Sequence, residues 1–97
     1  MKIIKSFNIL NKEINSIKNI GFVPTMGSLH DGHLSLIKNA KNKSSKILVS
    51  IFVNPAQFND KKDFSKYPRD LKKDISILKK TKIDYLFLPN NKEIYKK

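Results

Sequence analysis

The segment PTMGSLHDGH, residues 24–33, holds two of the three glycines and both histidines of this 97-residue chain. His30 and His33 are three residues apart, so they share a face if the segment opens a helix. Imidazole N–H groups can donate hydrogen bonds to phosphoryl oxygens as negative charge develops on them. Gly27 and Gly32 would let a ligand approach the backbone closely. The segment therefore indicates an anion site at a helix N-terminus, with a nucleotide phosphate as the natural ligand.

Other interpretations of these residues stay open. A histidine near a helix start can be a cap, and the two glycines can simply form a turn. His30, His33 and Asp31 could bind a metal, but this set is weak evidence, and no metal site is predicted. The segment matches neither the Walker A loop nor the G-x-G-x-x-G fingerprint, which excludes those two modes of nucleotide binding.

Strands and helices are expected to alternate along the chain. Four apolar runs predict strands, namely residues 2–4, 20–24, 46–53 and 83–89. Helical spacing predicts helices from a Ser6 cap to about residue 19, from His30 or Asp31 past residue 40, and from Pro68 past residue 78. This alternation is typical of the α/β class, an open Rossmann-like parallel sheet with helices on both faces. Residues 1–97 are expected to form one partial domain of this kind.

All three predicted helices carry apolar stripes, which in the first helix consist of Leu10, Ile14 and Ile17. In the second helix, Leu34, Ile37 and Lys41 mark the stripe. In the last helix, Leu71, Ile75 and Leu78 form the stripe, with outward polar residues at Asp70, Lys72, Lys73 and Lys79. These stripes are expected to face the sheet.

The two least regular segments, residues 24–33 and 54–58, both follow predicted strands directly. Ligands of open α/β sheets bind beyond the carboxyl ends of the strands. Because parallel strands end at the same edge, we expect the two segments to form one site.

Composition limits the remaining possibilities. The net charge of +12 comes almost entirely from lysine, with Arg69 the single arginine, and the lysines are spread along the chain. Base-reading surfaces favour arginine, so no nucleic-acid partner is expected, although the positive field would attract a small anionic substrate. There is no cysteine, no apolar run of about 20 residues and no signal-peptide pattern. A cytoplasmic protein without a membrane segment is expected.

Several segments in order resemble one enzyme family. HDGH after a strand is similar to the H-x-G-H signature of the nucleotidylyltransferase superfamily. The wider text VPTMGSLHDGH, VSIFVNPAQF, YPRDL and DYLFLP resembles the N-terminal part of the pantoate–β-alanine ligase family, over essentially the whole chain. The resemblance implies ATP-dependent condensation of pantoate with β-alanine through pantoyl adenylate, with release of pyrophosphate and AMP. It also implies Mg²⁺ with the nucleotide and a homodimer in full-length members.

The resemblance also implies site residues. The ATP-binding loop would be Met26, Gly27, Ser28, Leu29, His30, Asp31, Gly32 and His33. Gly32 would leave room for the nucleotide, and His33 would be the catalytic proton donor. Gln57 would bind pantoate and lie beside the β-alanine site, and its amide can both donate and accept hydrogen bonds. Asn54 would bind the same substrate, or it is a turn residue before Pro55.

Members of this family continue well beyond 97 residues. The resemblance implies that a second phosphate-binding segment, a mobile loop and a smaller C-terminal domain are missing. The chain is therefore expected to be a fragment with little activity alone. Two alternatives are another H-x-G-H nucleotidyltransferase, which NPAQF disfavours, and a non-catalytic remnant or basic nucleotide- or nucleic-acid-binding module.

Overall fold

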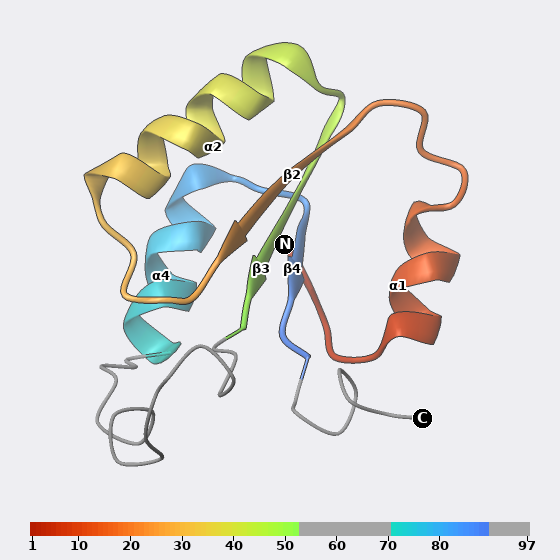
Figure 1. The fold of residues 1–97 in the computed structure, drawn as a ribbon, viewed down its shortest axis with the longest axis horizontal. Coiled ribbons are helices and arrows are strands. Elements are labelled where there is room, and N and C mark those ends of the chain that lie inside the picture. Colours follow the sequence, from red (N-terminus) through yellow and green to blue (C-terminus); the bar gives the residue numbers. More distant parts are fainter. Residues whose placement is uncertain (53–70, 90–97) are drawn as a thin grey trace, which may run out of the picture.

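The computed structural model describes residues 1–52 and 71–89. Within them, four parallel strands form one sheet in the order β1-β4-β3-β2. The strands are β1 (Lys2–Ile4), β2 (Ile20–Thr25), β3 (Lys46–Ile51) and β4 (Tyr85–Phe87), and the helices are α1 (Phe7–Ile14), α2 (Asp31–Lys43) and α4 (Leu71–Thr81). Helices α2 and α4 cover one face of the sheet and α1 lies on the other (Figure 1). The predicted parallel α/β architecture with helices on both faces is confirmed.

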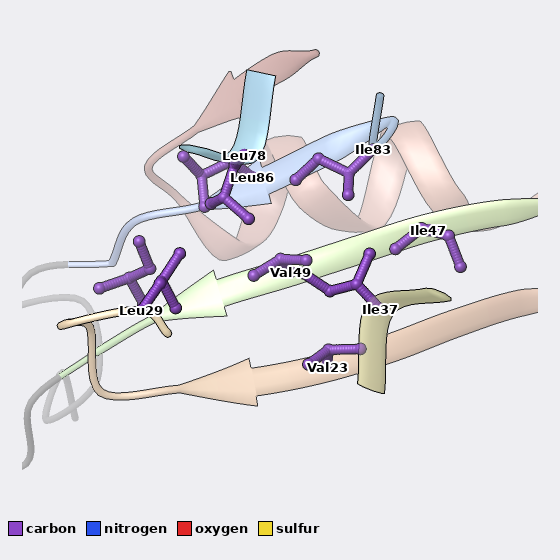
Figure 2. Close-up of a cluster of buried hydrophobic side chains, with 9 residues drawn as sticks. Val23, Leu29, Ile37, Ile47, Val49, Leu78, Ile83 and Leu86 are labelled. Carbon is purple, nitrogen blue, oxygen red and sulfur yellow. The ribbon is translucent and has the colours of Figure 1, made fainter. Parts of the chain in front are cut away.

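Two apolar clusters hold the helices against the sheet. The larger joins α2 and α4 to the sheet, and its buried members are Val23, Leu29, Ile37, Ile47, Val49, Ile51, Leu78, Ile83 and Leu86 (Figure 2). The smaller joins α1 to the opposite face through Ile4, Leu10, Leu48 and Phe87. Ile47, Val49 and Ile51 of β3 belong to the larger cluster and Leu48 to the smaller, so apolar side chains lie on both faces of this strand.

Strand β2 is an edge of the described sheet. Val23 and Thr25 lie on the face of the sheet that carries the larger cluster and are buried, whereas Phe22 and Pro24 are exposed. A proline, which cannot donate to a ladder, is tolerated at such an edge. Thr25 pairs with Ile51 at the carboxyl ends of β2 and β3, so the chain leaves both strands at the same end of the sheet.

Some predicted element ends are wrong. Helix α1 ends at Ile14 instead of near residue 19, and the N–H of Ile17 bonds the carbonyl of Ile14 in a tighter turn. Asparagine and serine follow Ile14, and their side chains compete with helical hydrogen bonds. Strand β4 covers only residues 85–87 of the predicted 83–89, because it pairs with the equally short β1.

The buried stripe of α4 also differs from the prediction. Leu71 is 44% exposed, and the fully buried positions are Asp74 and Leu78, with Ile75 only partly buried. Asp74 and Leu78 are four residues apart and therefore share one helix face. The start of α4 lies beneath the loop that follows β2 (Figure 1), so a polar residue meets that loop there. The predicted start at Pro68 and the outward Asp70 lie outside the described residues.

Candidate functional site

The start of the loop between β2 and α2 is held by the side chain of Thr25, the last residue of β2. The hydroxyl of Thr25 accepts a hydrogen bond from the N–H of Gly27 (3.2 Å) and donates one to the carbonyl of Ser50 in β3 (3.0 Å). Gly27 has φ +91°, and a Cβ there would lie 3.2 Å from Oδ2 of Asp74. Conformation and space therefore both favour glycine at this position.

The middle of the loop is bound to α4 through Asp74. Its Oδ2 accepts from the N–H of Ser28 (3.0 Å) and its Oδ1 accepts from the N–H of Leu29 (2.9 Å). Asp74 is only 3% exposed. The side chain of Leu29 is buried in the larger cluster, at the edge of the sheet toward which the strands point (Figure 2). The loop is thus held by both polar and apolar contacts.

The two histidines begin helix α2 as a reciprocal cap. His30 is the N-cap, and its Nδ1 accepts from the N–H of Gly32 (3.0 Å). Nδ1 of His33 accepts in return from the N–H of His30 (3.2 Å). This is the capping-box arrangement, with imidazole rings in place of the usual hydroxyl and carboxyl groups. The predicted helix start at His30 or Asp31 is confirmed.

This cap decides which ring nitrogens are available to a ligand. A nitrogen that accepts an N–H must present a lone pair, so each neutral ring carries its proton on Nε2. The two ring centroids are 4.2 Å apart. The N–H groups of Gly32 and His33 already bond to acceptors of His30. The groups at the start of α2 that can donate hydrogen bonds to a bound anion are therefore the two Nε2–H groups and the N–H of Asp31.

The surroundings of His33 shift the pKa of its imidazole ring. Burial lowers the pKa of His33 below its ordinary value of 6.5, and the neighbouring His30 ring lowers it further. The Asp74 carboxylate opposes both effects and raises it. The balance favours the neutral ring, which is the form the cap requires.

The residues predicted from sequence differ in accessibility. Met26, Ser28, His30, Asp31 and Gly32 are exposed and His33 is partly buried, whereas Gly27 and Leu29 are buried. Leu29 could therefore meet a ligand only through its backbone. Asn54 and Gln57, the predicted substrate-binding residues, lie outside the described residues.

Gly32 has a local reason to be glycine. A Cβ at Gly32 would lie 2.9 Å from Cε1 of His30 and 3.2 Å from its Nδ1. That Gly32 also leaves room for the nucleotide stays a prediction; in the structure the capping ring of His30 lies beside it. A side chain at this position would displace the ring.

Asp74 is the site residue that sequence reasoning missed. It lies 45 residues from Leu29 in the chain, so no local motif connects it with the loop. A signal existed nevertheless, because Asp74 is four residues before the buried Leu78 and so lies on the core-facing side of the helix. A carboxylate in such a place must find hydrogen-bond donors.

Two further observations concern residues 1–52 and 71–89. No three histidine, aspartate or glutamate side chains of these ranges lie close enough together to hold a metal ion. None of the helices described there is long and apolar enough to cross a membrane.

Comparison with known proteins identifies the family of this chain. The pantoate-beta-alanine ligase family profile matches residues 2–97. A pantothenate synthetase of Fervidobacterium nodosum is 50% identical over all of this chain and 36% of its own length. One of Francisella philomiragia is also 50% identical, over 97% of this chain and 36% of its own length. The chain thus spans about a third of the length of these relatives.

Solved structures agree with the sequence matches. The pantoate-beta-alanine ligase of Francisella tularensis, complexed with beta-gamma ATP and beta-alanine, has a TM-score of 0.92 and 48% identity over 98% of this chain and 38% of that one. The pantothenate synthetase of Thermus thermophilus has a TM-score of 0.89 and 37% identity over all of this chain and 35% of that one. The chain therefore belongs to the pantoate–β-alanine ligase family.

Proposed function

We propose that this chain forms the nucleotide-binding part of an ATP-dependent ligase that joins pantoate to β-alanine. In the first step the pantoate carboxylate attacks the α-phosphorus of ATP, and pyrophosphate leaves. In the second step the amine of β-alanine attacks the acyl carbon of pantoyl adenylate, and AMP leaves. Family membership over residues 2–97 and the ATP and β-alanine ligands of the Francisella tularensis relative support this reaction.

The observation that carries the proposal is the reciprocal cap of His30 and His33. Both rings use Nδ1 on the backbone of the loop, so each neutral ring has Nε2–H as its donor. Two such donors beside a helix N-terminus suit the oxygens of a phosphate chain. Donors fixed in advance stabilise the charge that develops at the α-phosphate without reorganising during the reaction.

His33 has the environment expected of the group nearest the reaction. Its lowered pKa favours the neutral, hydrogen-bond-donating ring near neutral pH. We assign it the catalytic role, and the remaining residues of 26–33 the binding of ATP. Gln57 and Asn54 are proposed to bind pantoate, with Gln57 also beside β-alanine. Mg²⁺ would accompany the nucleotide phosphates. The described residues offer it no three-ligand group, and the steps above do not depend on it.

A chimera tests the function directly. Residues 1–97 replace the matching segment of the Francisella tularensis ligase, which superposes on 98% of this chain. We expect pantothenate and AMP to form only when pantoate, β-alanine and ATP are all present. His33→Ala should lower pantoate-dependent adenylate formation by roughly 10²–10³-fold, the usual cost of removing one transition-state donor. The exposed Lys38 of the same helix provides the control variant, Lys38→Ala, which should keep the parent rate.

Two outcomes would contradict the proposal. A folded chimera without activity, beside an active Francisella enzyme, would show that this loop does not serve the reaction. Normal adenylate formation by His33→Ala would remove the catalytic role of His33. The 97-residue chain alone is expected to form no measurable pantothenate, since it spans about a third of its relatives' length.

A further inference from the structure

The loop between β2 and α2 contains two successive residues with left-handed backbone conformation. Gly27 has φ +91° and Ser28 has φ +53°. Glycine adopts this conformation freely, but for serine it is unfavourable and persists only where neighbouring contacts impose it. The N–H groups of Ser28 and Leu29 both bond to the carboxylate of Asp74. The carboxylate from α4 thus bonds to the second of these left-handed residues and to the residue that follows it.

Asp74 is well suited to hold this turn. Its two oxygens each accept one N–H, at 3.0 Å from Ser28 and 2.9 Å from Leu29. Hydrogen bonds to a carboxylate are stronger than those between neutral groups, and burial to 3% exposure strengthens them further. Leu78, one turn later, anchors the same face of α4 in the larger cluster. The carboxylate is thus fixed relative to the sheet.

The turn held by Asp74 leads directly into the histidine pair. Leu29 is followed by His30, whose N–H and ring make the reciprocal cap with Gly32 and His33. A change in the backbone at Ser28 or Leu29 would therefore rotate the N-cap and move both Nε2 atoms. Asp74 also acts on His33 through space, since its charge opposes the effects of burial and of His30 on the pKa of that ring.

We propose that Asp74 is a positioning residue of the adenylating site: its carboxylate imposes the turn at Gly27–Leu29 that sets the two imidazoles for the phosphates of ATP. Because it is only 3% exposed and bonds to the N–H groups of Ser28 and Leu29, it acts through the loop backbone. The inference rests on the proposed function for its catalytic consequence, whereas its structural part concerns this chain alone.

Hydrogen exchange on this chain tests the structural part. In the wild type the amides of Ser28 and Leu29 should be protected. In Asp74→Asn, which keeps size but offers one acceptor and a donor, at least one of them should lose protection. The NMR titration of His33 should move to lower pH, because the charge that raises its pKa is gone. If the variant does not fold, fast exchange of both amides in the wild type would by itself overturn the proposal.

Asp84→Asn is the matched control. Asp84 also accepts a hydrogen bond from a backbone N–H, that of Ile47 (2.8 Å), but it lies at the amino ends of the strands. Its substitution should expose the amide of Ile47 and leave the Ser28 and Leu29 amides and the His33 titration unchanged. Equal effects of the two variants on His33 would reduce Asp74 to a general stability residue and refute the proposal.

The chimera tests the catalytic part. Asp74→Asn should lower kcat for adenylate formation by about 10- to 100-fold, as expected of a small displacement of catalytic groups, with a lesser change in the KM for ATP. Asp84→Asn should leave both near the parent values. An unchanged kcat in Asp74→Asn, with an active parent chimera, would refute positioning. An inactive parent with protected Ser28 and Leu29 amides would refute only the function.

Discussion

Each end of the sheet has an aspartate that accepts backbone N–H groups. At the amino end, Asp84 accepts from Ile47 at 2.8 Å and lies 3.7 Å from the ammonium of Lys46, with about a third of its side chain exposed. At the carboxyl end, the buried Asp74 accepts from both Ser28 and Leu29. If Asp84 is removed, water can accept the hydrogen bond from the N–H of Ile47. Water reaches the buried N–H of Leu29, which bonds to Asp74, less easily.

The two ends also use glycine differently. A Cβ at Gly21, in the first half of β2, would lie 2.7 Å from Oγ of Ser44, a contact with a side chain. Gly27 combines a close approach to Asp74 with a φ of +91°. Crowding explains the first glycine, and backbone conformation explains the second. Both ends also contain a non-glycine residue with left-handed backbone conformation, Ser28 at the carboxyl end and Lys82 (φ +59°) before β4 at the amino end. At the carboxyl end two such residues, Gly27 and Ser28, follow each other and lead into the histidine pair.

Removing the two carboxylates should separate the two ends most strongly. Asp74→Ala removes the acceptor of the buried N–H of Leu29 and of the part-buried N–H of Ser28, and it should lower the free energy of unfolding by about 1–3 kcal/mol. Asp84→Ala should cost about 0.5–1.5 kcal/mol, because solvent reaches the vacated site. Urea unfolding of both variants measures the difference. Equal losses would mean that burial does not distinguish the two aspartates.

Alanine at the two glycines sharpens the same comparison. Gly27→Ala should cost about 1–2 kcal/mol, since a Cβ is unfavourable in the left-handed conformation. Gly21→Ala should be relieved by the second substitution Ser44→Ala, which removes the nearest atom. Thermal unfolding of the single and double variants checks this. Relief of Gly27→Ala by a substitution at Asp74 would show that crowding, and not conformation, requires the glycine.

A smaller, pH-dependent effect on stability is expected at the carboxyl end, from His33. The pKa of His33 is lowered in the folded chain, so the unfolded chain binds the extra proton first. Stability from this group is therefore complete above about pH 6.5 and is lost as the pH falls through the lowered pKa. Urea midpoints at about pH 7.5 and 5.5, on either side of the ordinary histidine pKa, should differ less in His33→Asn, which keeps His30. An equal difference in both proteins would exclude His33 as the source.

Much of the fold was predictable because it depends on local patterns. The β-branched run of β3 identifies a strand covered on both faces, and the histidine pair with its flanking glycines identifies the start of α2. Strand ends were less predictable, since β4 is only as long as its pairing with β1 allows. Helix α1 likewise ends where asparagine and serine side chains compete with its backbone.

The sequence by itself determined the parallel α/β class, the place of His30 and His33 at a helix start, and the family. These depend on residue types at short spacings, where helical and extended geometry leave little choice. Tertiary structure alone decided that Leu29 enters the core and that Asp74 holds the loop. Such contacts join residues up to 46 positions apart, and only the packing of α4 against the sheet brings them together.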